Sequence, residues 1–488
     1  MRFRIFYNND ADNLFSHIKE PITPHTISNA IAEIARSGVD ALLINPNMQR
    51  TNYPSRVWQT FWDGYKENDK LFFGKIPQEY IPRRKKCIKQ MKRLADSGYD
   101  YLKHALSCCR ETQVIPGVSI RMNDMHDAPW PGSNLYSNFY MNHHELHLAN
   151  PSACGWGAKG LNYRHKVVRN YYLSLIKEIA ENYDFEILEL DFLRFQSYFP
   201  RNEYSLNTAI MTSFISDIRK LLNKTKRKIE LIPRISLSPS SAFELGFDVK
   251  KWCKNGLVDG ITIGAFLQVP WNAHIDEYRE LTGNTIPIYV STDLVAAKPE
   301  GLTERLFPLE EELMRGFAAG VHAAGANGIS LFNFFSSRKY KKEPLFKSVP
   351  CMRPPFIALP KKYLLNTHTS NGETDGPIQL PQFLPPRQPK SFWLWMGGEK
   401  NVAAKTKIIF SGKIPKETLR LNFNYFPAGH PSKVAIIKKK PTCLHMAEFE
   451  VPASTIKNGK NKIILRSETN SITVLSIEVI IPPIEKQA

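Results

Sequence analysis

The stretch HKVVRNYYLSLIKEIAENYDFEILELDFLRF, residues 165–195, contains the pattern that decides the fold. Its first part repeats apolar residues at helical spacing, which predicts an amphipathic helix over residues 165–183. The residues of that apolar face are Val168, Tyr172, Leu175 and Ile179. A short apolar run follows at residues 185–190, and its length predicts a buried β-strand. A helix that leads into a buried strand is the repeating unit of parallel α/β folds.

Seven more short apolar runs precede residue 335, with amphipathic segments between them. They predict strands at residues 2–7, 41–44, 118–122, 229–235, 258–263, 286–290 and 328–332. Eight strands that alternate with helices predict an α/β protein built on a (β/α)8 TIM barrel with enlarged loops. A doubly wound sheet is the alternative. The first strand, however, is followed by NNDADN and not by the glycine-rich phosphate turn of that fold.

The pattern changes after residue 340. Residues 344–389 hold 10 of the 34 prolines, which is typical of a linker or an extended wrapping segment. Beyond it, apolar residues alternate with period two around turns, which predicts an antiparallel β-sandwich. We therefore expect a catalytic barrel at 1–340, a proline-rich linker at 341–389 and a β-sandwich at 390–488. The sandwich could bind carbohydrate, mediate dimerisation or cover barrel surface.

The composition narrows the classes of partner. The chain has 488 residues and a formal net charge of +19, from 65 Lys and Arg against 46 Asp and Glu. No nucleic-acid-binding motif accompanies its basic runs, so we expect a solvated basic surface and no nucleic-acid partner. No apolar run approaches the ~18 residues that span a bilayer, and the N-terminus lacks a signal-peptide pattern. We expect no membrane association, and the localisation stays open between cytoplasmic and exported with a removed signal. The seven cysteines predict neither a disulfide framework nor a zinc cluster.

Polar residues follow the predicted strands at the ends where barrel enzymes carry their chemistry. Asp10 and Asp12 follow strand one, and Asn333 follows strand eight. In strand four, Glu189 and Asp191 share one face and should point into the barrel. These two carboxylates either take part in the chemistry or pair with an arginine and orient it. The candidate arginines are Arg121 and Arg194.

The segment SIRMNDMHD, residues 119–127, runs past the end of strand three. His126 lies there between two aspartates. It is either an acid that takes part in the chemistry or a loop histidine held by hydrogen bonds. A nearby carboxylate such as Asp127 would favour the protonated ring. Arg121, together with Arg194 and Asn333, suits recognition of a carboxylate, because guanidinium groups bind carboxylates bidentately.

The long loop after strand three is rich in aromatic residues and histidines. Trp130 and Trp156 either form apolar walls for a sugar or pack within the loop, as do Tyr136 and Tyr140. The histidines of NHHELH, residues 142–147, match no established metal-ligand spacing. The sequence therefore predicts neither a metal nor a cofactor.

Four strings in the barrel region resemble the family-10-like glycosylhydrolase barrels found in bacteria. They are YPSRVW (53–58), MHDAPW (125–130), LELDFLRF (188–195) and NGLVDGI (255–261). More closely, the order and spacing of four residues are similar to those of the inverting exo-sialidases of glycoside hydrolase family 156. These four are Arg121, His126, Arg194 and Asn333.

The resemblance implies an exo-α-sialidase that releases terminal sialic acid from glycoconjugates in a single displacement. His126 would be the acid and Asp10 the base, with Asp12 as the second choice. Three residues would grip the sialic acid carboxylate: Arg121, Arg194 and Asn333. Asp191, Asp127 and Trp130 are also predicted to contact the substrate. The expected partner is a sialylated glycan, and the resemblance suggests a homodimer.

Two other functions stay open at this point. The first is a barrel glycoside hydrolase for another anionic glycan, uronic or sulfated, which would use Asp191 or Glu189 with Asp127. The second is a non-catalytic carbohydrate-binding protein whose binding surface is the β-sandwich. Barrels host many chemistries, so the fold alone does not choose among the three.

Overall fold

The structure is a computed structural model. It describes residues 3–10, 13–17, 20–69, 71–148, 159–200, 203–265, 269–292, 295–297, 306–308, 310–332, 345–357, 359–366, 379–398, 402–413, 415–438 and 442–483. Three residues named in the sequence predictions lie outside these ranges: Asp12, Trp156 and Asn333.

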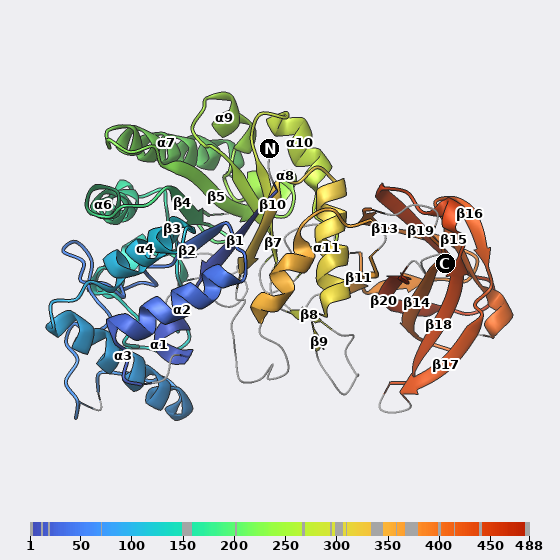
Figure 1. The fold of residues 1–488 in the computed structure, drawn as a ribbon, viewed down its shortest axis with the longest axis horizontal. Helices are drawn as coiled ribbons and strands as arrows, with labels where there is room; N and C mark the ends of the chain where they lie inside the picture. Colours follow the sequence, from blue (N-terminus) through green and yellow to red (C-terminus); the bar gives the residue numbers. More distant parts are fainter. Residues whose placement is uncertain are drawn as a thin grey trace.

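Eight parallel strands close into a barrel in the order β1-β10-β7-β6-β5-β4-β3-β2, which confirms the predicted fold (Figure 1). The strands are β1 (Arg4–Asn9), β2 (Ala41–Ile44), β3 (Ile115–Arg121), β4 (Ile187–Asp191), β5 (Glu230–Ser236), β6 (Ile261–Gly264), β7 (Ile288–Thr292) and β10 (Gly328–Phe332). Two of them coincide with the predicted ranges, and the bounds of the others differ by one to three residues.

Helices connect the strands around the outside of the barrel (Figure 1). They are α1 (Asn13–His17), α2 (Pro24–Arg36), α3 (Ile81–Asp96), α4 (Tyr101–Glu111), α5 (Asn138–Asn142), α6 (Lys166–Asn182), α7 (Tyr204–Asn223), α8 (Pro239–Glu244), α9 (Val249–Lys254), α10 (Ile275–Thr282) and α11 (Glu311–Ala323). At the start of α2 the Thr23 side chain accepts a hydrogen bond from the Thr26 backbone N–H, as the Thr-Pro signal predicts. Within the described ranges, no helix is both long and apolar enough to cross a membrane.

The inside of the barrel changes from apolar to polar along the strands. A small buried cluster fills the part nearer the amino ends of the strands: Phe6, Ala41, Leu43, Ile187, Ile232 and Tyr289. Side chains on one face of a strand recur every second residue, so the next inward positions lie two residues further on. On β1, β4, β5 and β7 these positions are polar: Asn8, Glu189, Arg234 and Ser291. The carboxyl ends of the strands therefore stand above a polar layer.

The C-terminal part forms an antiparallel β-sandwich, as predicted. One sheet has the order β11-β20-β14-β18-β17, with β12 on β20, and the other has the order β13-β19-β15-β16. Their strands are β11 (Lys361–Asn366), β12 (Gln382–Leu384), β13 (Lys390–Met396), β14 (Ala404–Ser411), β15 (Leu419–Phe423), β16 (Phe426–Gly429), β17 (Lys433–Lys438), β18 (Leu444–Val451), β19 (Gly459–Ser467) and β20 (Ile472–Ile481). Strands β11 and β12 come from the proline-rich stretch. A separate pair, β8 (Val295–Ala297) and β9 (Leu306–Pro308), follows β7.

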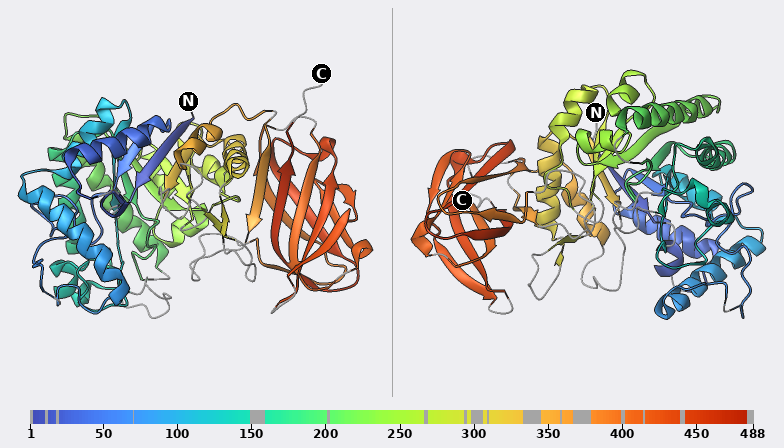
Figure 2. Two further views of the ribbon diagram at one scale, coloured as in Figure 1. Left: turned by 60° about the horizontal axis from the view of Figure 1, so that its bottom comes forward. Right: turned by 180° about the vertical axis from the view of Figure 1, so that it is seen from behind.

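Helix α11 packs against β11 and β13 of the sandwich, which lies at one side of the barrel (Figure 2). A side chain at Gly316 would overlap the Lys362 carbonyl group, and one at Gly320 would overlap the Trp395 carbonyl group. The Trp395 indole N–H also donates to the Ala273 carbonyl oxygen at 2.9 Å. Two glycines one helical turn apart thus let the sheet backbone approach the helix closely.

Candidate active site

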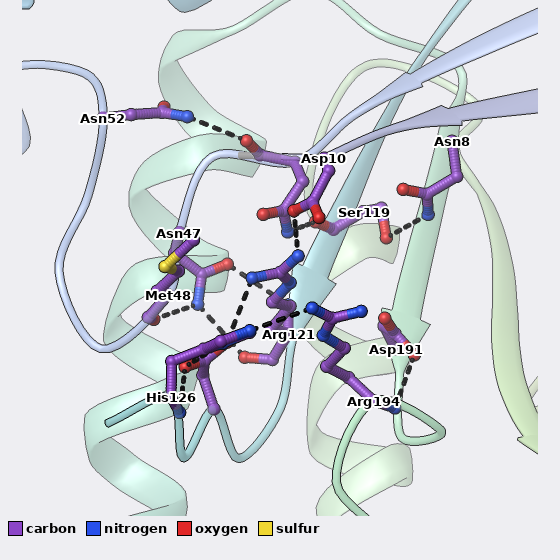
Figure 3. Close-up of polar contacts among 12 residues, drawn as sticks. Asn8, Asp10, Asn47, Met48, Asn52, Ser119, Arg121, His126, Asp191 and Arg194 are labelled. Atoms are coloured by element: carbon purple, nitrogen blue, oxygen red, sulfur yellow. Dashed lines mark hydrogen bonds and ion pairs between the residues drawn. The ribbon is translucent and has the colours of Figure 1, made fainter. Parts of the chain in front are cut away.

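Arg121, the last residue of β3, is the centre of a buried polar network at the carboxyl ends of the strands (Figure 3). Its Nη2 forms an ion pair with Asp10, which directly follows β1. Its Nη1 lies 3.1 Å from Asp124 Oδ2. The side chains of Arg121 and Asp124 are almost fully buried, and that of Asp10 is 9% exposed. Two carboxylates from different loops are thus held on one guanidinium group.

His126 is connected to the same network through Asp124. Its Nδ1 lies 2.9 Å from both carboxylate oxygens of Asp124, and its backbone N–H donates to Oδ1 at 3.0 Å. Burial alone would raise the pKa of Asp124, but the His126 ring and Arg121 outweigh it and hold that pKa well below its ordinary value. The imidazole therefore lies against a carboxylate that favours its ionised form, while 25% of the His126 side chain reaches solvent.

Arg194 contacts the other nitrogen of the ring. Its Nη2 lies 2.9 Å from His126 Nε2. A guanidinium group only donates, so Nε2 accepts in this state and Nδ1 carries the proton that faces Asp124. Burial and the neighbouring charge of Arg121 both lower the pKa of Arg194. Arg121 and Arg194 are thus two adjacent cations whose repulsion an anionic ligand would relieve.

The segment after β2 holds this network in place from the backbone side. The side chain of Asn47 accepts from the Arg121 N–H at 3.2 Å and donates to the Arg121 carbonyl oxygen at 3.1 Å. Gln49 Nε2 donates to the Asp124 carbonyl oxygen at 3.1 Å. These two amide side chains fix the loop that carries His126 against the end of β2.

The two carboxylates of β4 lie in a second cluster inside the barrel. Glu189 Oε1 accepts from Asn8 Nδ2 at 2.7 Å and from Ser119 Oγ at 2.8 Å. Complete burial, offset in part by Arg234, raises the pKa of Glu189 to about 7. Asp191 pairs with Arg234 at 2.9 Å, and not with the side chain of Arg121 or Arg194 as the orienting alternative supposed.

Asp127 and Trp130 contact other partners. Arg84 of α3 forms an ion pair with Asp127, with Nη2 2.6 Å from Oδ1, and Ser133 also donates to that carboxylate. The expectation that Asp127 supports the His126 ring is therefore wrong, because Asp124 occupies that position. Trp130 is partly buried, with its ring 5.5 Å from that of Tyr80.

Among the described residues of the long loop, two tyrosines and one histidine pack against one another. The Tyr136 and Tyr140 rings lie 5.0 Å apart, and the Tyr136 hydroxyl donates to the Asp127 carbonyl oxygen at 2.6 Å. His147 stacks on Tyr140 at 4.1 Å, and His143 Nδ1 lies 2.9 Å from Glu145. Across the described part of the chain, no group of three His, Cys, Asp or Glu side chains is arranged to hold a metal ion.

The structure thus brings together Asp10, Arg121, His126 and Arg194, four of the predicted site residues. It adds several residues that the sequence predictions did not assign: Asp124, Asn47, Arg84 and Arg234. Asp124 lies three residues after Arg121 and two before His126, a spacing that could have identified it. The others come from distant parts of the chain (the segment after β2, α3 and β5), and no local pattern marks them. Chemically, the network offers two cations for an anionic group, one imidazole ring and two carboxylates.

A scan of the sequence against models of protein families finds no match, and a search of curated proteins finds none either. Among solved structures, the chain is similar to alpha-L-fucosidase isoenzyme 2 from Paenibacillus thiaminolyticus, with 10% identity and a TM-score of 0.46. That match covers 72% of this chain and 49% of the fucosidase, so this chain spans about half the length of the fucosidase. The PgaB (BpsB) glycoside hydrolase domain from Bordetella bronchiseptica matches with 10% identity and a TM-score of 0.42, over 68% of this chain and 94% of that domain. The maltogenic alpha-amylase AmyB from Thermotoga neapolitana matches with 11% identity and a TM-score of 0.39, over 97% and 98% of the two chains.

Proposed function

We propose that this protein is an inverting exo-α-sialidase, similar to those of glycoside hydrolase family 156. One observation carries the proposal. Arg121 lies between the proposed base, Asp10, and Asp124, which supports the proposed acid, His126. A base and an acid on either side of an arginine that can bind a carboxylate would suit hydrolysis of a sialoside with inversion.

The carboxylate of the substrate is the proposed anchor. A sialoside carries that group on its anomeric carbon, where positive charge develops as the glycosidic bond breaks. Contacts through His126 and Asp124 connect the two arginines, Arg194 and Arg121. A guanidinium group can donate bidentately to a carboxylate. Asn333 is proposed as a third donor, because it directly follows β10. Binding the carboxylate at this position places the anomeric carbon beside the acid and the base.

His126 is the proposed general acid. The substrate carboxylate would draw the Arg194 N–H groups away from Nε2, which then takes up a proton. Asp124 stabilises the resulting imidazolium through Nδ1, since the low pKa of Asp124 keeps its carboxyl ionised. The Nε2 proton then passes to the glycosidic oxygen as the bond to the anomeric carbon breaks.

Asp10 is the proposed general base. Its carboxylate pairs with Arg121, and its side chain is 9% exposed. It takes one proton from a water molecule whose oxygen attacks the anomeric carbon on the face opposite the leaving group. The α-linked sialoside is thereby converted into the β-anomer of free sialic acid, and the proton balance is restored when Asp10 and His126 exchange protons with solvent.

The competing carboxylate-pair mechanism has weaker support. It requires Asp191 or Glu189 to act with Asp127. Each of these carboxylates is buried and already engaged: Asp191 by Arg234, Glu189 by Asn8 and Ser119, and Asp127 by Arg84. Asp10 is also paired, with Arg121, but its side chain is 9% exposed, against 2% or less for these three.

The decisive test is incubation with 2,3- or 2,6-sialyllactose while NMR follows the first-formed anomer of sialic acid. Initial β-anomer is the expected result. Initial α-anomer would show retention and exclude the single displacement. Activity on uronic or sulfated glycans without sialoside hydrolysis would favour the carboxylate-pair enzyme. Sialic acid binding without turnover on any glycan would favour the non-catalytic alternative.

His126→Ala tests the acid in the same assay. We expect turnover to fall by about 10³-fold, as is typical for loss of a general acid. His147→Ala is the matched control, because His147 packs on Tyr140 away from the network and should leave turnover close to that of the wild type. A His126→Ala variant with full activity would remove this residue from the mechanism.

A further inference from the structure

Arg234 is a second buried arginine next to the site, one layer deeper in the barrel. It belongs to β5, and its side chain is 1% exposed. Its Nη1 donates to Asp191 Oδ1 at 2.9 Å, and its Nε donates to Ser291 Oγ at 3.1 Å. A buried ion pair of this kind usually adds little stability compared with well-packed apolar residues. The geometry of the Arg234–Asp191 pair indicates another role for Arg234.

The Asp191 oxygen that Arg234 contacts also fixes the turn that leads to Arg194. Asp191 Oδ1 accepts from the Leu193 N–H at 3.1 Å and from the Arg194 N–H at 3.2 Å. Three donors therefore converge on one oxygen, and two of them are backbone groups of the segment that carries Arg194. The position of the Arg194 backbone depends on that of the Asp191 carboxylate, which Arg234 holds.

Phe332 provides a second connection between the two arginines. The guanidinium carbon of Arg234 lies 3.8 Å from the centre of its ring, and that of Arg194 lies 5.5 Å from it. Cations stack favourably on an aromatic face, so one ring contributes to the orientation of both side chains. Phe332 is also the last residue of β10, directly before Asn333.

We propose that Arg234 is a positioning residue, which holds Arg194 against His126 through the carboxylate of Asp191. Its importance for substrate binding rests on the proposed sialidase function, because Arg194 then binds the substrate carboxylate. Its importance for the contact between Arg194 and His126 does not depend on the reaction. The two parts can therefore be tested separately.

The first test is independent of any substrate. In protein labelled with 15N-histidine, the Nε2 signal of His126 reports the hydrogen bond from Arg194, and its absence in His126→Gln identifies it among the 13 histidines. Arg194→Gln gives the displacement caused by loss of that bond. We expect Arg234→Gln to displace the signal in the same direction and by a comparable amount. An unchanged signal in folded Arg234→Gln would overturn the proposal.

Arg219→Gln is the matched control. Arg219 pairs with Asp259, whose carboxylate accepts the Leu231 N–H, so the same arrangement recurs at the start of β5, away from the site. This variant should leave the His126 signal unchanged. If Arg234→Gln does not fold, Arg234→Lys and Asp191→Asn replace it. Each then has to displace the His126 signal, by less than Arg194→Gln, and a wild-type signal in both would overturn the proposal.

The second test uses sialyllactose. We expect Arg234→Gln to lower kcat/KM by about tenfold, mainly through KM, because a displaced Arg194 weakens binding of the carboxylate in the ground state and the transition state alike. Arg234→Lys should recover part of the loss, and Arg219→Gln should leave KM unchanged. An unchanged KM in Arg234→Gln would overturn the role in binding. Absence of turnover in the wild type would instead refute the sialidase function, and the NMR result alone would then decide the proposal.

Discussion

Two polar clusters lie at the carboxyl ends of the barrel strands, and they differ in access to solvent. The outer network consists of Asp10, Arg121, Asp124, His126 and Arg194. The inner cluster consists of Asn8, Ser119, Glu189, Asp191 and Arg234. In the outer network the side chain of His126 is 25% exposed and that of Asp10 is 9% exposed. Every side chain of the inner cluster is buried, and Glu189 and Arg234 are completely so.

The two clusters also differ in their balance of charge. The outer network has two arginines and two ionised aspartates, so a bound carboxylate would leave one negative charge. In the proposed mechanism, the proton that His126 takes up would compensate that charge. The inner cluster has one arginine for two carboxyl groups, and burial, together with the charge of Asp191, raises the pKa of Glu189 against the opposing effect of Arg234. The outer network is thus suited to bind an anion and transfer protons, and the inner cluster is suited to support it.

The largest expected effect separates the two clusters directly. Asp10→Asn removes the proposed base from the outer network and should lower kcat by about 10³-fold. Glu189→Gln, a change of the same kind in the inner cluster, should lower it less than about threefold. The measurement is kcat on sialyllactose at saturating substrate for both variants. Equal losses in the two variants would abolish the functional distinction between the clusters, and full activity of Asp10→Asn would leave Asp12 as the candidate base.

The fold was predictable because the inward and outward faces of the strands are mostly apolar. The ranges 41–44 and 328–332 were predicted correctly, since the first is uniformly apolar and the second has Ser330 as its one polar residue. The first strand was predicted to end at Tyr7, but it continues through Asn8 and Asn9. Polar residues can remain in strand conformation there because the inner cluster provides hydrogen-bond partners within the barrel. Hydrophobicity alone places the end of such a strand too early.

The site residues at the strand ends could be predicted from the sequence. The side-chain partners within the loops could not. Asp10 follows β1 and Arg121 ends β3, both at the carboxyl ends of the barrel strands, so their meeting could be expected. The choice between Asp124 and Asp127 as the neighbour of His126 depends on one turn. Asp127 has a φ of 68°, in the left-handed region, and its side chain pairs with Arg84, 43 positions earlier. No pattern near His126 predicts such a distant partner.

A smaller effect on kcat is expected for Asp124, the outer-network carboxylate that contacts the proposed acid, His126. Asp124→Asn keeps an acceptor for the Nδ1 proton of His126 but removes the negative charge that stabilises the imidazolium. We expect kcat to fall by about 10²-fold and the basic limb of the pH–rate profile to move to lower pH. The pH–rate profile of the wild type and of the variant measures both. Asp127→Asn is the control, because that residue pairs with Arg84, and its basic limb should not move.

The smallest effect on turnover belongs to Glu189, whose contribution should appear in stability. Its pKa in the folded protein is about 7, against an ordinary value of 4.5. Between these two pH values the unfolded chain has released this proton while the folded protein retains it. The stabilisation from this group is therefore complete below pH 4.5 and is lost as pH rises through 7, by up to about 3 kcal/mol.

Glu189→Gln cannot ionise and should not show that loss. The free energy of unfolding in urea, measured from pH 4.5 to pH 8, should thus shift in favour of the variant by about 3 kcal/mol relative to the wild type. Glu230→Gln at the start of β5 is the control, since its carboxylate reaches solvent and its difference from the wild type should stay constant across this range. A constant difference for Glu189→Gln as well would mean that the inner cluster tolerates an ionised Glu189. The distinction between the two clusters would then rest on solvent access alone.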